Sequence, residues 1–488
     1  MAKKSIKKNY IYNLIYKILS LITPFMTAPY VARVLGADGV GTASYTESIV
    51  AYFILFAALG LDIFGQREIS YVQDSLEKRT VIFWETVVFK CTTSAIAIFV
   101  YIIFAINQSQ SELYLVLALS IVSTATDVTW FFQGIEEFGK IVLRNIIFKV
   151  LHIAYIFAVI RTKNDLIWYL LGTSGFGVLS NISLWPYLRR YISKPCFKNL
   201  KPQRHIKTVI SLFIPTIAIQ VYTVLDKTMI GAITHDAFEN GYYEQAIKIS
   251  KMVLVVVTSL GTVMIPRIGY HFERGETEKV RSYMYRGYKF VWFLGIPLCL
   301  GLMMVAGNFV PWFFGQEYEK VAPLIGILSL LILAIGISNV TGMQYLIPTK
   351  RQNVFTRTVI YGAVMNFAMN YFLIQKFQSY GAAVASVAAE TLIAVVQIFI
   401  VRKELSPWEI IKSGWHYYVA GAIMAAVLFF VKGYFAATII NTLILVIIGA
   451  TVYFSVLLVI RDQFFFDNVI FVGKKTMRKL KKSLADKV

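Results

Sequence analysis

Fourteen apolar segments, each long enough to cross a lipid bilayer, fill this chain almost from end to end. A helix needs about 20 mostly apolar residues to cross the hydrocarbon core of a membrane. The gaps between the segments are too short to hold a water-soluble domain. The sequence therefore predicts an all-α, polytopic membrane protein. We place the spans at residues 9–33, 39–64, 80–106, 112–135, 141–160, 165–188, 207–233, 240–266, 287–310, 321–346, 354–376, 380–401, 414–432 and 437–460.

The composition and the missing motifs exclude a soluble protein and most enzymes. Hydrophobic residues make up 57% of the chain and charged residues only 15%, too few to coat a surface that faces water. The sequence lacks the phosphate-binding loop GxxxxGK[ST] and the HExxH and GxSxG motifs, and its three cysteines show no paired spacing. We therefore expect a transporter without a metal or cofactor, apart from a coupling ion such as H⁺ or Na⁺.

The net charge of +21 is placed in a way that indicates orientation rather than nucleic-acid binding. When residues at span ends are counted with the adjoining loop, 36 of the 48 Lys and Arg lie in the even-numbered loops and the two tails. Basic loops next to spans are retained in the cytoplasm. Both termini are therefore predicted to be cytoplasmic, and the basic surface is expected to contact anionic lipid.

Short internal matches predict that the first twelve spans form two parallel repeats, a recurring transporter design. The matching segments are Ser20–Pro24 with Ser211–Pro215, Leu59–Gly60 with Leu260–Gly261, and Thr126–Thr129 with Ser338–Thr341. Their offset grows from 191 to 201 to 212 residues, as loop insertions would produce. The domains are expected at 1–206 (N-lobe with linker), 207–410 (C-lobe), 411–462 (two further spans) and 463–488 (basic tail).

Six lysines fall inside the predicted spans, where each one costs roughly 2.5–3.5 kcal/mol if it faces lipid at the centre of the bilayer. Most must therefore face a hydrated interior or lie near enough to a span end for the ammonium to reach water. Helical spacing favours an interior, because polar residues form one stripe on several spans. The candidate substrate-binding residues, which would hold an anionic solute, are Lys17, Lys90, Lys149, Lys227, Lys248 and Lys251.

Carboxylates inside the spans are candidates for ion coupling, because a carboxylate in a low-dielectric cavity can exchange a proton or coordinate Na⁺. The ion-coupling candidates are Asp226, Glu390, Asp127 and Glu47. The alternative is that an acid balances a lysine or lies at an interface. This alternative is favoured for the acids near span ends, Asp62, Glu85 and Glu244, and it stays open for Asp226, which adjoins Lys227.

Three segments carry a resemblance to a known family. The segment Asp127–Glu136 reads DVTWFFQGIE and resembles the W-[FL]-[FY]-Q-G-x-E signature of bacterial polysaccharide-repeat-unit flippases of the Wzx type. Pro29–Gly41 (PYVARVLGADGVG) is similar to their first-helix motif. Leu225–Gly231 (LDKTMIG), followed by Gly241-Tyr242-Tyr243, is similar to their seventh- and eighth-helix motif. The resemblance extends over nearly the whole chain.

This resemblance implies the fold of the multidrug/oligosaccharidyl-lipid/polysaccharide exporters, in which two six-helix lobes surround a central cavity and two helices follow. It also implies a multi-pass protein of the bacterial cytoplasmic membrane that moves undecaprenyl-diphosphate-linked oligosaccharide by alternating access, with H⁺ or Na⁺ antiport. A polysaccharide polymerase and export machinery are the implied protein partners. No motif assigns the lysines to the diphosphate, so that assignment rests on charge alone.

Two other functions stay open at this stage. A cation-coupled multidrug exporter of the same fold should have an acidic cavity, and the surplus of lysines argues against it. A membrane glycan polymerase or ligase usually has a large external loop with essential Arg or His, and no loop of that size lies between the predicted spans.

Overall fold

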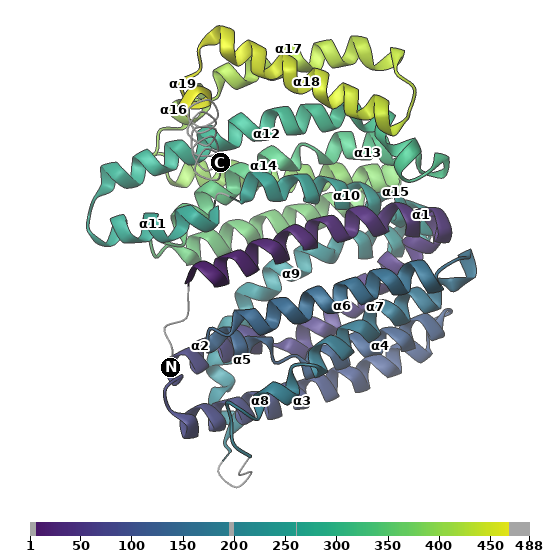
Figure 1. The fold of residues 1–488 in the computed structure, drawn as a ribbon, viewed down its shortest axis with the longest axis vertical. Coiled ribbons are helices and arrows are strands. Elements are labelled where there is room, and N and C mark those ends of the chain that lie inside the picture. The colour runs from purple at the N-terminus through teal and green to yellow at the C-terminus, as the bar shows by residue number, and fades with distance from the viewer. Residues whose placement is uncertain (1–5, 195–199, 260, 468–488) are drawn as a thin grey trace, which may run out of the picture. The chain divides into compact units, whose positions relative to one another are not determined.

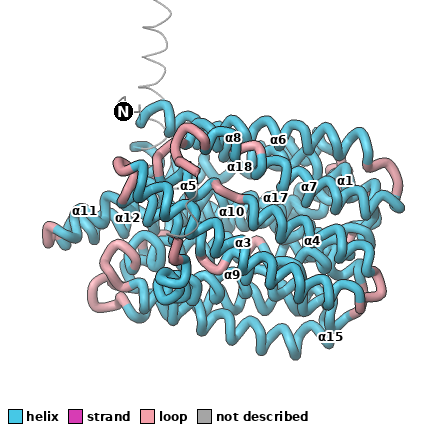
Figure 2. The backbone as a smooth tube through the Cα atoms, turned by 90° about the horizontal axis from the view of Figure 1, so that it is seen from below, coloured by secondary structure: helices cyan, strands magenta, loops and turns pink. Residues whose placement is uncertain are grey.

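The computed structural model describes residues 6–194, 200–259 and 261–467, with side chains from residue 23 onward except those at 214–216, 218–219, 221–222 and 262–263 (Figure 1). All regular structure in these residues is helical, and the backbone tube in Figure 2 shows helices joined by short loops. The predicted all-α class is confirmed.

Each of the fourteen predicted spans coincides with a helical segment within the described residues. Nine helices in this part of the chain are long and apolar enough to cross a membrane, and two of them, of 49 residues each, are long enough for two spans. The helices that carry the spans are α1 (Ile6–Ala58), α3 (Leu76–Ile106), α4 (Ser111–Thr126) with α5 (Thr129–Gly134), α6 (Phe138–Val159), α7 (Leu166–Ile182), α9 (Ile206–Thr234), α10 (Ala237–Thr258), α12 (Thr277–Phe313), α13 (Val321–Leu328) with α14 (Leu331–Ser338), α15 (Gln352–Ile400), α17 (Trp415–Val431) and α18 (Ile439–Ile460). Shorter helices are α2 (Leu61–Tyr71), α8 (Trp185–Leu188), α11 (Gly261–Glu273), α16 (Pro407–Lys412) and α19 (Gln463–Phe465).

Single residues with non-helical backbone divide the two longest helices. Gly36 in α1 has φ 75° and ψ 172°, and Gln378 in α15 has φ 53° and ψ −130°. Glycine adopts positive φ at little cost because it has no Cβ. Each break therefore joins two successive spans with almost no loop, so that α1 carries spans one and two and α15 carries spans eleven and twelve.

The chain forms two compact units, and the first comprises residues 1–244 with 370–379. In this unit α1, α3, α4, α6 and α7 pack side by side, and α9 packs against α1 and α2 (Figure 1). The unit therefore includes α9, the first turns of α10 and the segment around the break in α15. This grouping reflects spatial proximity, and the lobe boundaries expected from the repeat stay a prediction.

The WFFQG segment forms α5, and its aromatic side chains build the core at one end of the first unit. Trp130, Phe131 and Phe132 are each at most 1% exposed. Trp130 lies against Gly65 of α2, where an added Cβ would stand only 2.4 Å from the indole ring. The aromatic side chains of the WFFQG segment therefore pack α5 against α2.

Replacing Gly65 by valine should lower the stability of the protein markedly, because the new side chain would overlap the Trp130 ring. Overpacking of a filled core costs about 1–3 kcal/mol. The matched control is Gly175→Val in α7, where an added Cβ meets nothing within 4 Å. The apparent melting temperature of each variant in detergent tests this expectation, and equal values for the two would contradict it.

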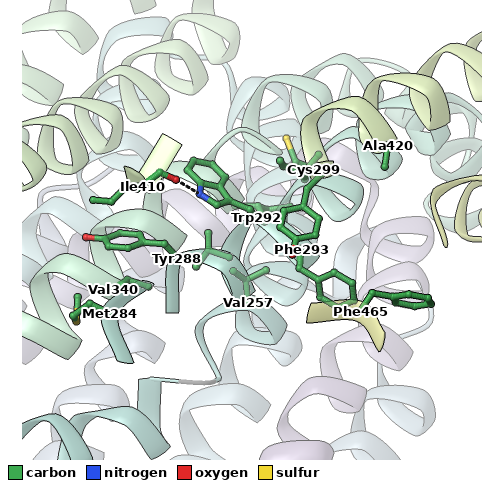
Figure 3. Close-up of a cluster of buried hydrophobic side chains, with 14 of the residues drawn as sticks. Val257, Met284, Tyr288, Trp292, Phe293, Cys299, Val340, Ile410, Ala420 and Phe465 are labelled. Carbon is green, nitrogen blue, oxygen red and sulfur yellow. Dashed lines mark hydrogen bonds between the residues drawn. The ribbon is translucent and has the colours of Figure 1, made fainter. Parts of the chain in front are cut away.

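The second unit comprises residues 245–369 and 380–488. Here α12 packs against α13, α14, α17 and α18. Figure 3 shows the apolar core along α12, in which Tyr288, Trp292, Phe293 and Cys299 are buried. The Trp292 indole N–H donates to the Ile410 carbonyl oxygen at 3.0 Å, so the polar atom of this buried ring is satisfied.

Candidate functional site

A cluster of charged side chains lies inside the first unit, on α1, α9 and α10. The Lys227 ammonium contacts Glu244 Oε2 at 2.5 Å, and the two side chains are only 23% and 14% exposed. The Ser44 hydroxyl of α1 donates to the same Glu244 oxygen at 3.1 Å. Glu244 therefore joins three helices through one carboxylate oxygen.

Asp226 is the second carboxylate of this cluster, and both of its oxygens accept hydrogen bonds. The Tyr243 hydroxyl donates to Oδ2 at 2.5 Å, and the Asn370 amide of α15 donates to Oδ1 at 2.7 Å. Asp226 is therefore held by helices α10 and α15 within the same unit.

Three carboxylates surround the Lys227 ammonium. Asp226 and Glu47 both act electrostatically on Lys227, in addition to its direct partner Glu244. Carboxylates inside membrane helices are costly and are commonly found where protons or ions move.

The way in which α9 and α10 turn back on each other explains these pairs. The two helices are joined by residues 235 and 236, and His235 has the left-handed φ of 50° that ends α9. The short turn brings the end of α9 back along the start of α10. Because neighbours on a helix point about 100° apart, Asp226 and Lys227 turn to different partners, and Asp226 meets Tyr243 whereas Lys227 meets Glu244.

A second ion pair lies on α2 and α3. Lys90 is 1% exposed, and its ammonium contacts Asp62 Oδ1 at 2.6 Å and donates to the Asp127 carbonyl oxygen at 3.1 Å. The Asp127 carboxylate itself accepts the backbone N–H of Thr129 at 2.8 Å, at the start of α5. The Lys90 ammonium is therefore paired with Asp62 in this conformation. An anion could bind Lys90 only if it displaced the Asp62 carboxylate.

A third buried acid holds the linker in front of α9. Glu85 of α3 is fully buried, and it accepts the Lys201 backbone N–H at 2.8 Å and the Arg204 guanidinium at 2.5 Å. The His205 ring lies 2.8 Å from the same carboxylate. These partners satisfy Glu85 completely, so it anchors the chain entering α9.

The structure brings some of the predicted site residues together. Asp226, Lys227 and Glu47 belong to one cluster, whereas Lys90 lies with Asp62 and the Asp127 backbone. The other candidates are described by their helix and burial. Lys149 is partly buried on α6, Lys248 is partly buried and Lys251 exposed on α10, Glu390 is partly buried on α15, and the Lys17 side chain lies outside the described residues. The binding and coupling roles of all these residues stay predictions.

Sequence reasoning did not single out Ser44, Tyr243 and Asn370 as members of the cluster. Tyr243 stands in the segment quoted as a family motif, which is a usable signal. Asn370 lies four residues after Asn366, so both amides lie on one face of an apolar span, and both are fully buried. Ser44 carries no signal in the sequence, because small hydroxyl residues are common inside membrane helices.

Comparison with known proteins places the chain in a family. The family described as "Polysaccharide biosynthesis protein" matches residues 6–271, more than half of the chain and all three motif segments. The chain belongs to this family. It is 23% identical over 406 residues to the protein named "Putative O-antigen transporter" of Escherichia coli K12, a match that covers 82% of this chain and 97% of that protein.

Solved structures share the fold of this polysaccharide biosynthesis family member. A lipid II flippase, MurJ, in its inward closed conformation has a TM-score of 0.72 at 15% identity and covers 95% of this chain and 99% of its own. An inward-facing multidrug resistance MATE family transporter of the MOP superfamily has a TM-score of 0.64 at 13% identity, covering 81% of this chain and 96% of its own. The expected exporter fold is confirmed.

Proposed function

We propose that this protein is a flippase that carries undecaprenyl-diphosphate-linked oligosaccharide repeat units across the bacterial cytoplasmic membrane by alternating access. It acts as a transporter and catalyses no covalent step. Family membership and the likeness to an O-antigen transporter over most of both chains support this function. The observation that carries it is the cluster of the ionisable residues Asp226, Lys227 and Glu244 inside an apolar helix bundle, because such groups are costly in a membrane and persist where transport needs them.

We further propose that a cation, H⁺ or Na⁺, drives transport by binding at the Asp226 cluster. The carboxylates of Asp226, Glu244 and Glu47 around Lys227 support a cation site, because carboxylates inside membrane helices can exchange a proton or bind a cation. Entry of one positive charge would weaken the hold of Glu244 on Lys227 and Ser44. The coupling ion would therefore alter the contacts between α1, α9 and α10, which is the kind of change a transport cycle needs.

Deletion of the gene from its native host tests the proposed flippase function. Lipid-linked repeat units should accumulate on the cytoplasmic face of the membrane, and surface glycan should disappear. If instead the repeat units reach the outer face but stay unpolymerised, the protein would be a polymerase and the proposal would be wrong. Complementation with the wild-type chain provides the control for effects on neighbouring genes.

Asp226→Asn tests the coupling proposal. The change keeps the size of the side chain but removes its charge, so the protein should fold and should lose most of its glycan display at equal protein level. Lowering the pH or the Na⁺ concentration should alter display by the wild type and leave the residual display of Asp226→Asn unchanged. A variant that responds to the ion as the wild type does would contradict a coupling role for Asp226.

A cation-coupled multidrug exporter is the second candidate, and the three carboxylates around Lys227 are the observation that favours it. Increased sensitivity of the deletion strain to cationic dyes, with normal glycan display, would support this candidate and exclude the flippase.

A further inference from the structure

Two small-residue segments cross in direct backbone contact within the first unit. An added Cβ at Gly41 of α1 would lie 1.7 Å from the Ala237 carbonyl oxygen of α10. An added Cβ at Gly241 would lie 2.0 Å from the Ala37 carbonyl oxygen. The contact is therefore reciprocal, and it leaves no space for any side chain larger than hydrogen at either glycine.

The same contact continues one turn further along both helices. The Ser44 hydroxyl of α1 donates to Glu244 of α10, and these residues follow Gly41 and Gly241 by three positions. Positions 37, 41 and 44 thus face positions 237, 241 and 244, with the small-xxx-small spacing that lets membrane helices approach closely. Two parallel helix segments meet here in identical register.

This register coincides with the internal repeat of the sequence. The offset of 200 residues between the two Ala-x-x-x-Gly segments lies between the 191 and 201 residues of the two neighbouring matches, Ser20–Pro24 with Ser211–Pro215 and Leu59–Gly60 with Leu260–Gly261. The crossing therefore joins positions that are equivalent in the predicted repeats, as expected for a contact near the axis that relates two such repeats.

The crossing lies on the side of the odd-numbered connections. It directly follows the break at Gly36 in α1 and the turn at residues 235–236 that joins α9 to α10. On the same side, Glu239 accepts the Ser379 backbone N–H at 3.1 Å and its hydroxyl at 2.6 Å, next to the break in α15. The distribution of Lys and Arg predicts that this side faces outward.

We propose that the crossing of Ala37–Ser44 with Ala237–Glu244 is the latch that closes the outward side of the transport path, and that the Lys227–Glu244–Ser44 contacts lock it. The proposal rests on the proposed transport function. In the latched state the carbonyl oxygens of one helix touch the glycine of the other, so nothing passes between them. Release of cargo to the outside requires these backbones to part.

The physical character of the contact suits a latch that opens repeatedly. Between membrane helices there is no hydrophobic driving force, so a small-residue crossing is held by packing and by a few hydrogen bonds. The Ser44–Glu244 bond is one of these, and it depends on the charge of Glu244, which also holds Lys227. A cation at the Asp226 cluster would therefore weaken the Ser44–Glu244 bond, which lies one helical turn from the Gly41–Gly241 crossing.

Thiol labelling in whole cells tests the latch. The three native cysteines (Cys91, Cys196 and Cys299) are replaced by alanine, and a reporter cysteine is placed at Ser48, which is 2% exposed and lies two turns beyond Gly41. A membrane-impermeant maleimide is added outside. The parent protein carries Ser48→Cys as its only cysteine. When Gly41→Leu or Gly241→Leu is added, the Ser48→Cys thiol should react with the maleimide at least about tenfold faster than in the parent. A tenfold change corresponds to a loss of about 1.4 kcal/mol in the free energy that holds the latch closed.

The control is Gly175→Leu in α7, where an added Cβ meets nothing, and it should label at the parent rate. Ser44→Ala is a milder variant that should fold normally, and it should also accelerate labelling because it removes one lock contact. Unchanged labelling in Ser44→Ala and in whichever leucine variants retain the parent's melting temperature would overturn the proposal. Labelling that is accelerated only from the cytoplasmic side, in inverted vesicles, would overturn it as well.

The labelling readout is independent of cargo, so the two proposals can fail separately. If deletion of the gene leaves lipid-linked repeat units distributed normally, the flippase function is wrong. Faster labelling in the latch variants would then still support a latch, in a protein that transports another solute. If repeat units accumulate inside the deletion strain but labelling never responds to Gly41→Leu, Gly241→Leu or Ser44→Ala, the flippase function stands and the latch is wrong.

Discussion

Lys227→Met is expected to abolish transport and to destabilise the protein, with the largest effect of any single charge removal in the described part of the chain. The substitution keeps the length of the side chain but removes the ammonium that contacts Glu244 and acts electrostatically on Asp226 and Glu47. Removing one partner of a buried ion pair costs about 3–5 kcal/mol, because the other charge stays buried without compensation. The apparent melting temperature in detergent and the surface glycan per protein molecule measure the two effects.

The double variant Lys227→Met/Glu244→Gln separates the two effects. It removes the unbalanced carboxylate, so much of the lost stability should return, and the two single changes should be strongly non-additive. Transport should stay low, since Glu244 is then neutral and cannot respond to a coupling ion. A Lys227→Met protein that melts and transports like the wild type would show that the ion pair has no role.

Lys90→Met is expected to give the second largest loss of stability. Its ammonium is 1% exposed and has two partners, Asp62 and the Asp127 carbonyl oxygen, which lies just before α5. Loss of the ammonium leaves the Asp62 carboxylate, whose side chain is 46% exposed, to water alone, while the Asp127 carbonyl oxygen keeps the Trp130 indole N–H as a donor. We therefore expect a loss of about 1–3 kcal/mol, as for a polar group that loses a buried partner. The melting temperature and the amount of folded protein in the membrane measure it.

An exposed lysine provides the matched control for Lys90. Lys350 forms a 2.7 Å ion pair with Glu273, but the two side chains are 73% and 59% exposed. Exposed pairs contribute about 0–1 kcal/mol, so Lys350→Met should change the melting temperature little. In a third variant, Lys90→Met/Asp62→Asn should recover part of the loss. Equal effects of Lys90→Met and Lys350→Met would contradict the interpretation of Lys90 as a buried structural charge.

Much of the fold follows from local properties of the sequence. The length of apolar segments is limited by the thickness of the bilayer, so all fourteen spans coincide with helical segments in the described residues. The breaks inside α1 and α15 were not predicted as such. Gly36 gives a signal for the first, because glycine favours positive φ, but Gln378 carries none, and only its surroundings hold it at φ 53°.

The candidate site was predictable in part. Charged residues in apolar spans identified Asp226, Lys227 and Glu47 as residues that need a protected environment, and the structure gathers these three. The predicted role of the lysines as free partners of an anion meets a difficulty, because Lys90 and Lys227 each contact a carboxylate in this conformation. Binding of a diphosphate at either residue would require the carboxylate to be displaced or protonated first.

The sequence by itself determined that this is a helical membrane protein of a polysaccharide biosynthesis family, since span length, charge distribution and motifs are properties of contiguous residues. Only the tertiary structure decided which charges meet. Lys227 pairs with Glu244 of the next helix although Asp226 is its neighbour in the chain, and Lys90 pairs with Asp62, which lies 28 residues earlier. The rotation and lateral packing of each helix select these partners, and the periodicity of a single helix does not specify either one.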